Sequence, residues 1–102
     1  MQRPQHKPEK MPPDKQWRVR FEVRHEYPSP AIPNAMVNLR QDLGDRLIDI
    51  LSGFGLLAIL VRVVAQSKEE AELYARKILL PLLPHSGLGY FAITRIEGRE
   101  MR

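Results

Sequence analysis

The sequence predicts a two-layer α/β (or α+β) sandwich whose elements follow the order β-α-β-α-β. Three segments have strand patterns, two helical segments separate them, and the central strand is apolar on both faces. Because a helix joins each pair of consecutive strands, we expect a three-stranded parallel sheet with both helices on one face. The alternative is a ferredoxin-like sheet with an added strand, which would come from residues 1–15 or from another chain.

The first predicted strand runs from Trp17 to Tyr27 and alternates between apolar and charged residues. Its charged side is mostly cationic and includes Arg18, Arg20 and Arg24. A period of two is typical of a strand with one buried face and one solvated face. Three prolines within residues 28–33 end the strand, since proline fixes φ and has no N–H to donate.

The first predicted helix runs from Asn34, which suits the N-cap position, to about Ser52. Apolar residues recur within it at spacings of three and four, as on an amphipathic helix. Gly44 would lie in the middle of this helix, at a cost of about 1 kcal/mol relative to alanine. Gly53 and Gly55 are expected to end the helix, because glycine tolerates left-handed backbone.

The second predicted helix begins at a capping box formed by residues 67–70, in which Ser67 and Glu70 each accept from the other's backbone N–H. It runs from Lys68 to about Leu80, where Pro81 follows. The last predicted strand spans residues 89–97. Its phase is ambiguous, because either of its faces could point toward the helices.

The central strand, residues 56–66, lacks the alternation of a strand with one solvated face, so both of its faces need cover. We expect the wholly apolar set to face the helices: Leu57, Ile59, Val61, Val63 and Ala65. The opposite face then carries Arg62 together with the candidate interface residues Leu56, Ala58, Leu60 and Val64. Exposed apolar patches often mark interfaces, so we expect a homodimer formed through this open face or through an edge strand.

Length and composition indicate one small domain in a chain of 102 residues. We expect residues 1–15 to be a disordered, basic, proline-rich tail, residues 16–98 to be the domain, and residues 99–102 to be a charged tail. The absence of cysteine excludes disulfides and thiolate metal sites. Arg62 interrupts the longest apolar run and no signal peptide is recognisable, so we expect a cytoplasmic protein without a membrane span.

The net charge of +4 makes nucleic acid the second candidate partner. The arginines expected to contact phosphate are Arg18, Arg20, Arg24, Arg62 and Arg95. Trp17 or Phe91 could stack on bases. In this hypothesis binding weakens steeply with salt, because arginines that neutralise phosphates release counterions.

Catalytic and metal-binding patterns are weak. Ser86 follows His85 directly, but a nucleophilic serine also needs an orienting group and an oxyanion site. Asp42, Asp45 and Asp49 share one side of the first predicted helix, where Arg46 neutralises them. We therefore assign no catalytic, cofactor or metal residue. A non-enzymatic interaction module is the first hypothesis, and a small-ligand-binding domain or enzyme is the third.

Overall fold

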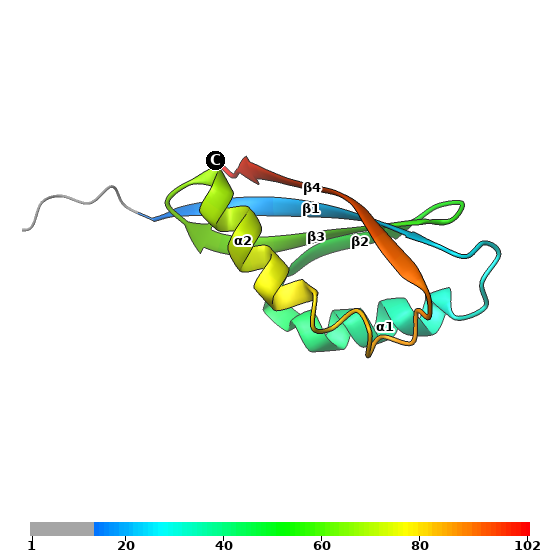
Figure 1. The fold of residues 1–102 in the computed structure, drawn as a ribbon. Coiled ribbons are helices and arrows are strands. Elements are labelled where there is room, and N and C mark those ends of the chain that lie inside the picture. The colour runs from blue at the N-terminus through cyan, green and yellow to red at the C-terminus, as the bar shows by residue number, and fades with distance from the viewer. Residues whose placement is uncertain (1–13) are drawn as a thin grey trace, which may run out of the picture.

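The computed structural model describes residues 14–102 and shows an antiparallel sheet of four strands with two helices on one face (Figure 1). The elements are β1 (Lys15–His25), α1 (Ile32–Leu43), η1 (Gly44–Arg46), β2 (Leu47–Ser52), β3 (Leu56–Ala65), α2 (Lys68–Leu79) and β4 (Phe91–Glu100). Residues 1–13, which make up most of the predicted tail, lie outside the described residues. The chain is thus a mixed α+β domain, and the prediction of three parallel strands is wrong.

The strand order is β2-β3-β1-β4, and every neighbouring pair is antiparallel. With the chain order β-α-β-β-α-β, this is the connectivity of the ferredoxin-like arrangement. The alternative prediction named that arrangement but took the added strand from residues 1–15 or from another chain. The strand comes instead from inside the predicted first helix.

Gly44 follows the last residue of the first helix, Leu43, so the helix ends about nine residues earlier than predicted. The backbone of Gly44 has φ 56° and ψ −129°, a conformation that is open to glycine and closed to residues with a Cβ. The apolar residues that follow in β2 were assigned to a helical stripe. A short apolar run fits a buried helix segment and a strand that is buried on both faces equally well, so periodicity alone could not distinguish the two.

Gly53 and Gly55, which were expected to end a helix, instead build the hairpin between β2 and β3. The N–H of Gly53 donates to the carbonyl of Leu56 at 2.8 Å, and Gly55 has φ 76°. A tight hairpin joins only antiparallel strands, whereas parallel strands need a long crossover. This turn therefore decides the direction of β3 relative to β2.

The hydrophobic core lies between the sheet and the two helices. The helix-facing set predicted for β3 is confirmed: Leu57, Ile59 and Val61 are fully buried, and Val63 and Ala65 are nearly so. β1 contributes the matching buried set, which is Trp17, Val19, Phe21 and Val23. Each helix adds three buried residues: Ala35, Leu39 and Leu43 from α1, and Ala71, Ala75 and Leu79 from α2.

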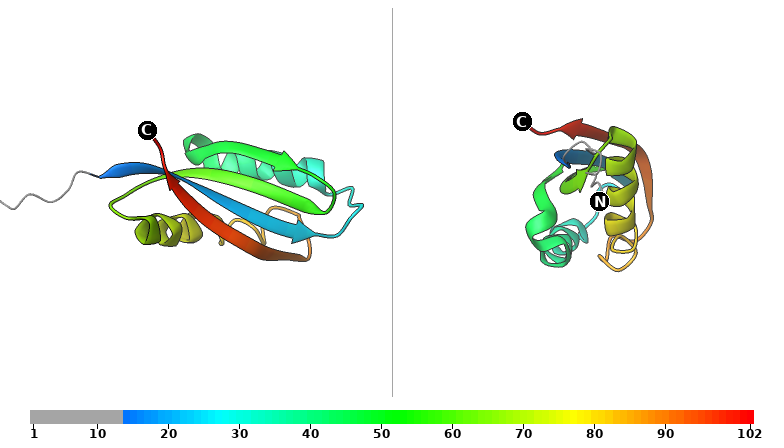
Figure 2. Two further views of the ribbon diagram at one scale, coloured as in Figure 1. Left: turned by 90° about the horizontal axis from the view of Figure 1, so that it is seen from above. Right: turned by 90° about the vertical axis from the view of Figure 1, so that its left-hand side faces the viewer.

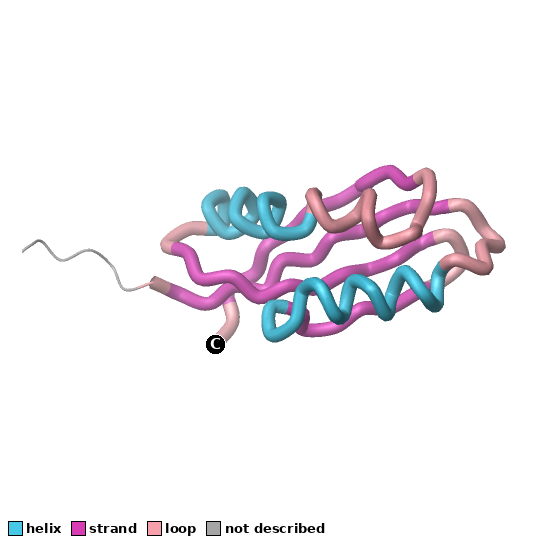
Figure 3. Tube along the Cα trace, turned by 90° about the horizontal axis from the view of Figure 1, so that it is seen from below, coloured by secondary structure: helices cyan, strands magenta, loops and turns pink. Residues whose placement is uncertain are grey.

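The two helices lie beneath different parts of the sheet and are offset along the strands (Figure 3). α2 begins with the predicted cap, in which the Ser67 hydroxyl accepts from the N–H of Glu70 at 3.2 Å. The second half of the predicted box differs, because the Glu70 carboxylate accepts from the N–H of Gln66 at 3.0 Å. No helix within residues 14–102 is long and apolar enough to cross a membrane.

The phase of β4 changes within the strand, which explains why the sequence left it ambiguous. The pairing of β4 with β1 shifts between Glu22 and Val23, so that Glu22 pairs with Arg95 and Val23 pairs with Ile93. A bulge of this kind inserts one residue and reverses the face of those beyond it. β4 also continues through Glu100, which the sequence analysis placed in a charged tail.

Replacing Gly44 with alanine is expected to destabilise the protein by about 1–2 kcal/mol, since a Cβ is strained at this backbone conformation. The matched control is Gly53→Ala. A Cβ at either glycine would meet no atom within 4 Å, but only Gly44 has a positive φ. Urea unfolding measures the free energy of unfolding of both variants. An equal loss in Gly44→Ala and Gly53→Ala would show that the positive φ of Gly44 does not cause the destabilisation.

Candidate functional site

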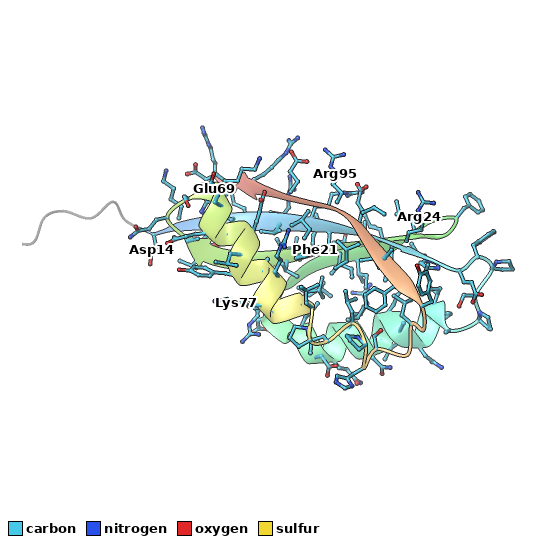
Figure 4. The ribbon with its side chains drawn as sticks, in the orientation of Figure 1. Asp14, Phe21, Arg24, Glu69, Lys77 and Arg95 are labelled. Atoms are coloured by element: carbon cyan, nitrogen blue, oxygen red, sulfur yellow. The ribbon has the colours of Figure 1, made fainter. Side chains whose placement is uncertain are left out.

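The face of the sheet turned away from α1 and α2 has no covering layer in residues 14–102 (Figure 2). We call it the open face. Cross-strand pairing and alternation place on it Arg18, Arg20, Glu22 and Arg24 from β1; Asp49 and Leu51 from β2; Leu56, Ala58, Leu60, Arg62 and Val64 from β3; and Ala92, Arg95, Glu97 and Arg99 from β4. Figure 4 shows Arg24 and Arg95 projecting from this side of the sheet.

The open face divides into two halves of different chemistry. Over β2 and β3 its residues are mainly apolar, whereas over β1 and β4 they are mainly charged. Across the whole face, six arginines stand against three carboxylates. The face is therefore cationic, and its charge is concentrated on the β1–β4 half.

A hollow of about 390 Å³ lies on the charged half. It is lined by Arg18, Arg20, Glu22, Leu60, Arg95, Glu97 and Arg99. Leu60 is the only apolar residue of this lining, and it reaches the hollow from β3, the strand next to β1. The hollow therefore combines an aliphatic contact with charged groups from β1 and β4.

Two ion pairs neutralise the middle of the hollow. Arg20 Nε lies 3.0 Å from Glu22 Oε2, and Arg95 Nη2 lies 2.9 Å from Glu97 Oε1. Each pair joins residues two apart on one strand, which point to the same face. Arg20 also faces Glu97 across the strands, and Glu22 faces Arg95, so opposite charges alternate in both directions.

Arg18 and Arg99 lie at one end of the hollow without such neutralisation. They are directly opposite each other on β1 and β4. Neither has a hydrogen bond or an ion pair with any residue in the range 14–102. Like charges at directly opposite positions destabilise a sheet, and a bound anion would remove that repulsion. This pair is therefore a region of unneutralised positive charge at the end of the hollow.

The structure gathers three of the five predicted polyanion contacts around the hollow: Arg18, Arg20 and Arg95. Arg62 pairs with Arg18 in the register, but its Nη1 donates to the carbonyl of Asp45 at 3.3 Å, on the side away from the hollow. Arg24 pairs with Leu56 and Ala92 and does not line the hollow.

Arg99 falls within the predicted charged tail, residues 99–102, and was therefore not predicted to lie in the sheet. The alternation of Arg95, Glu97 and Arg99 continues with a period of two. Extending the last predicted strand along that alternation would have found Arg99.

The predicted apolar interface lies on the open face but is partly shielded. Ala58 is only 5% exposed, Leu56 and Leu60 are half-buried, and Val64 is 52% exposed. Arg20 and Glu22 lie directly opposite Leu60 and Ala58, and the aliphatic parts of such side chains cover neighbouring apolar surface. Leu51 of β2, which was not predicted, adds an exposed leucine to the same half.

The aromatic residues proposed for base stacking are on the wrong side of the sheet. Trp17 is 8% exposed, and its Nε1 donates to the carbonyl of Ala65 at 2.9 Å. Phe91 packs against the core from the same side. In a strand, successive side chains alternate between faces, so a residue in the core cannot also serve the open face. The stacking prediction is therefore wrong.

Ser86 has a structural role in the loop after α2. Its side chain is fully buried; the hydroxyl donates to the carbonyl of Leu83 at 2.7 Å and accepts from the N–H of Leu88 at 3.2 Å. Within residues 14–102, no group of three or more histidines, cysteines or carboxylates could hold a metal ion. Asp49 lies in β2, where its carboxylate accepts from the N–H of Ile50 at 2.8 Å.

Side chains block backbone donors on both outer strands of the sheet. The Glu72 carboxylate from α2 accepts a hydrogen bond from the N–H of Gly98 in β4 at 2.8 Å. The Asp49 carboxylate accepts one from the N–H of Ile50 in β2. Charged groups at these positions oppose pairing with another strand. One backbone donor on each outer strand is thus unavailable for pairing with another strand.

No protein-family model, curated protein or solved structure matches this chain.

Proposed function

We propose that the protein binds nucleic acid through the open face, with Arg18 and Arg99 as the principal phosphate contacts. The observation that carries this proposal is the unneutralised arginine pair at the end of the hollow. A guanidinium group matches the geometry of a phosphate with two parallel hydrogen bonds. Two such groups on adjacent strands suit successive phosphates of one chain or two oxygens of a single phosphate.

The charge of the open face favours nucleic acid over a second copy of the chain. A face-to-face dimer would bring together two surfaces that each carry more arginines than carboxylates, and like charges across an interface cost binding energy. A polyanion instead gains from every unpaired arginine on the face. The net charge of +4 for the whole chain favours the same partner.

The open face is suited to contacts with the sugar–phosphate backbone rather than with bases. Among the described residues, its side chains include no aromatic ring on which a base could stack. Phosphate contacts position a protein on nucleic acid but carry no sequence information. We therefore expect binding that tolerates many sequences and depends strongly on salt.

A second candidate function is self-association through the apolar half of the open face. It is favoured by the exposure of Leu51 and Val64, at 48% and 52%, beside the half-buried Leu56 and Leu60. A dimer confined to this half would keep the charged halves at its periphery. The two functions are compatible in that case, because a dimer would double the arginine pairs available to a polyanion.

Removing the arginine pair is expected to weaken nucleic-acid binding and its salt dependence. Fluorescence anisotropy with a labelled single strand of about 20 nucleotides measures affinity from low salt to about 0.2 M. The double variant Arg18→Ala/Arg99→Ala should lose about 1.4 from the slope of log K against log salt, because two phosphate contacts are lost. Arg40→Ala, an exposed arginine of α1, is the control. No binding by the unmodified protein at low salt, or an equal loss in Arg40→Ala, would contradict the proposal.

Removing the neutralising carboxylates is expected to strengthen the same binding. Glu22→Gln and Glu97→Gln each free an arginine of the hollow from its ion-pair partner. The anisotropy assay should show a steeper salt slope and an affinity at low salt higher by about three- to tenfold. The matched control is Glu69→Gln, an exposed carboxylate at the start of α2 that changes net charge equally. A gain of the same size in the control would mean that net charge alone controls binding.

Self-association is tested by light scattering after size exclusion. The second candidate predicts twice the chain mass of 11.8 kDa and a return to monomer in Leu51→Asp. Val37→Asp is the control, because Val37 of α1 is 51% exposed and lies away from the open face. A monomeric unmodified protein at high micromolar concentration would eliminate this candidate and leave nucleic-acid binding untouched.

A further inference from the structure

One part of β3 has an open edge within the described residues. β2 pairs with β3 from Leu57 to Val61, whereas β1 pairs with β3 as far as Ala65. Residues 62–65 therefore have β1 on one side and no strand on the other. The left view of Figure 2 shows that β2 runs beside only part of the length of β3.

The backbone of Val64 faces this open edge. At the start of β3, the carbonyl of Leu56 accepts from Gly53 on the β2 side. The pairing of β3 with β1 has no irregularity, so the direction of the backbone groups alternates without interruption along the strand. The N–H and C=O of every second residue from Leu56, ending with Val64, consequently point to the β2 side.

A groove of about 420 Å³ runs beside this edge, between η1 and α2. Its apolar lining consists of Val63, Val64, Tyr74 and Ile78, and Arg46 and Arg62 add two guanidinium groups. Asp45 is the only carboxylate of the lining. We call this feature the edge groove. It combines free backbone groups, apolar contacts and an excess of positive charge.

The three features together are those of a strand-addition site. In such a site an extended peptide pairs with a sheet edge, and every second side chain enters a pocket. Glu72 and Asp49 each occupy one backbone donor on the outer strands, at Gly98 of β4 and at Ile50 of β2. Val64 and Tyr74 are 52% and 38% exposed, which leaves apolar surface uncovered at the edge groove.

The charge of the edge groove selects among its possible occupants. Neither Arg46 nor Arg62 forms an ion pair within residues 14–102, and both would attract an acidic side chain. The chain's own residues 1–13 carry Arg3, Lys7 and Lys10 against one acidic residue, so they match poorly. A second copy presents the same excess of positive charge and also matches poorly.

We propose that the edge groove binds an extended segment of a partner protein in which apolar and acidic residues alternate. The segment adds to β3 as a strand through the N–H and C=O of Val64. Its apolar side chains contact Val63, Tyr74 and Ile78, and its carboxylates contact Arg46 and Arg62. This proposal assigns Arg62 to a protein partner and does not depend on nucleic-acid binding by the open face.

The test is an NMR titration of the full chain with a capped hexapeptide of alternating valine and glutamate. A hexapeptide with lysine in place of glutamate is the matched probe. We expect chemical-shift changes at the amides of residues 62–65, Tyr74 and Ile78, and slower hydrogen exchange at Val64. The affinity for the glutamate peptide should be at least tenfold higher than that for the lysine peptide. Arg46→Glu should reverse the preference between the peptides, whereas Arg40→Glu on α1 should keep it. Both arginines are exposed, so the fold should survive.

The variant Arg18→Ala/Arg99→Ala separates this site from the open face and should bind the glutamate peptide unchanged. Four results would overturn the proposal. The first is no shift at millimolar peptide, and the second is shifts confined to the hollow of Arg18 and Arg99. The third is a chemical-shift change at the edge groove that depends on protein concentration without peptide, which would identify a second copy of the chain as the occupant. The fourth is a chemical-shift change at the edge groove when residues 1–13 are deleted, which would identify the chain's own N-terminal segment as the occupant.

Discussion

The register between β1 and β3 is the constraint on which the rest of the structure depends. These two central strands pair over ten residues without interruption, and the residues that pair, such as Val19 with Val61 and Phe21 with Ile59, enter the core together. Because side chains alternate along a strand, a slip of one residue in β1 would turn its arginines into the core and its apolar residues into solvent. The burial of several large side chains therefore holds the arginines of β1 on the open face.

The chemistry of the open face follows from that register and from the position of β4. Pairing with β1 brings Glu97 opposite Arg20 and Arg95 opposite Glu22, which neutralises the centre of the hollow. One row further along, the same pairing sets Arg99 opposite Arg18, and neither forms an ion pair within residues 14–102. The sheet thus separates neutralised from unneutralised arginines within one surface. The second group carries the proposed contact with phosphate.

The edges of the sheet also differ in whether their backbone groups are occupied by a side chain or left without a strand partner. Gly98 has no side chain, and this allows Glu72 of α2 to approach and bind its N–H; a Cβ there would lie 3.3 Å from Glu72 Cγ. β2 is short and begins opposite Val61, so the C-terminal end of β3 lies beside apolar residues of α2 without a strand partner on that side. The edge groove shares Arg62 and Val64 with the open face, but it contains neither Arg18 nor Arg99, so the proposed phosphate contacts lie outside it.

Much of the candidate site was predictable from alternation within single segments. The two faces of β3, the cationic face of β1 and the cap at Ser67 each depend on residues a few positions apart, and local patterns describe such spacings well. Arg18 and Arg20 were therefore placed on one face of their strand, whereas the face of Arg95 was left open. Arg99 required only that the last strand be extended by a few residues along the same pattern.

What the tertiary structure alone decided depends on contacts between distant residues. The run from Leu47 to Leu51 becomes a strand because Gly44 stops α1 and because β3 offers an edge with which that run can pair. The phase of β4 depends on a bulge against β1, and Arg62 turns toward Asp45 because η1 lies beside it. Such outcomes follow from pairing between strands far apart in the chain. The sequence by itself thus determined which residues share a face of β1 and of β3. The packing of strands and helices decided that β2 is a strand, which residues of β4 share a face, and which side chains meet.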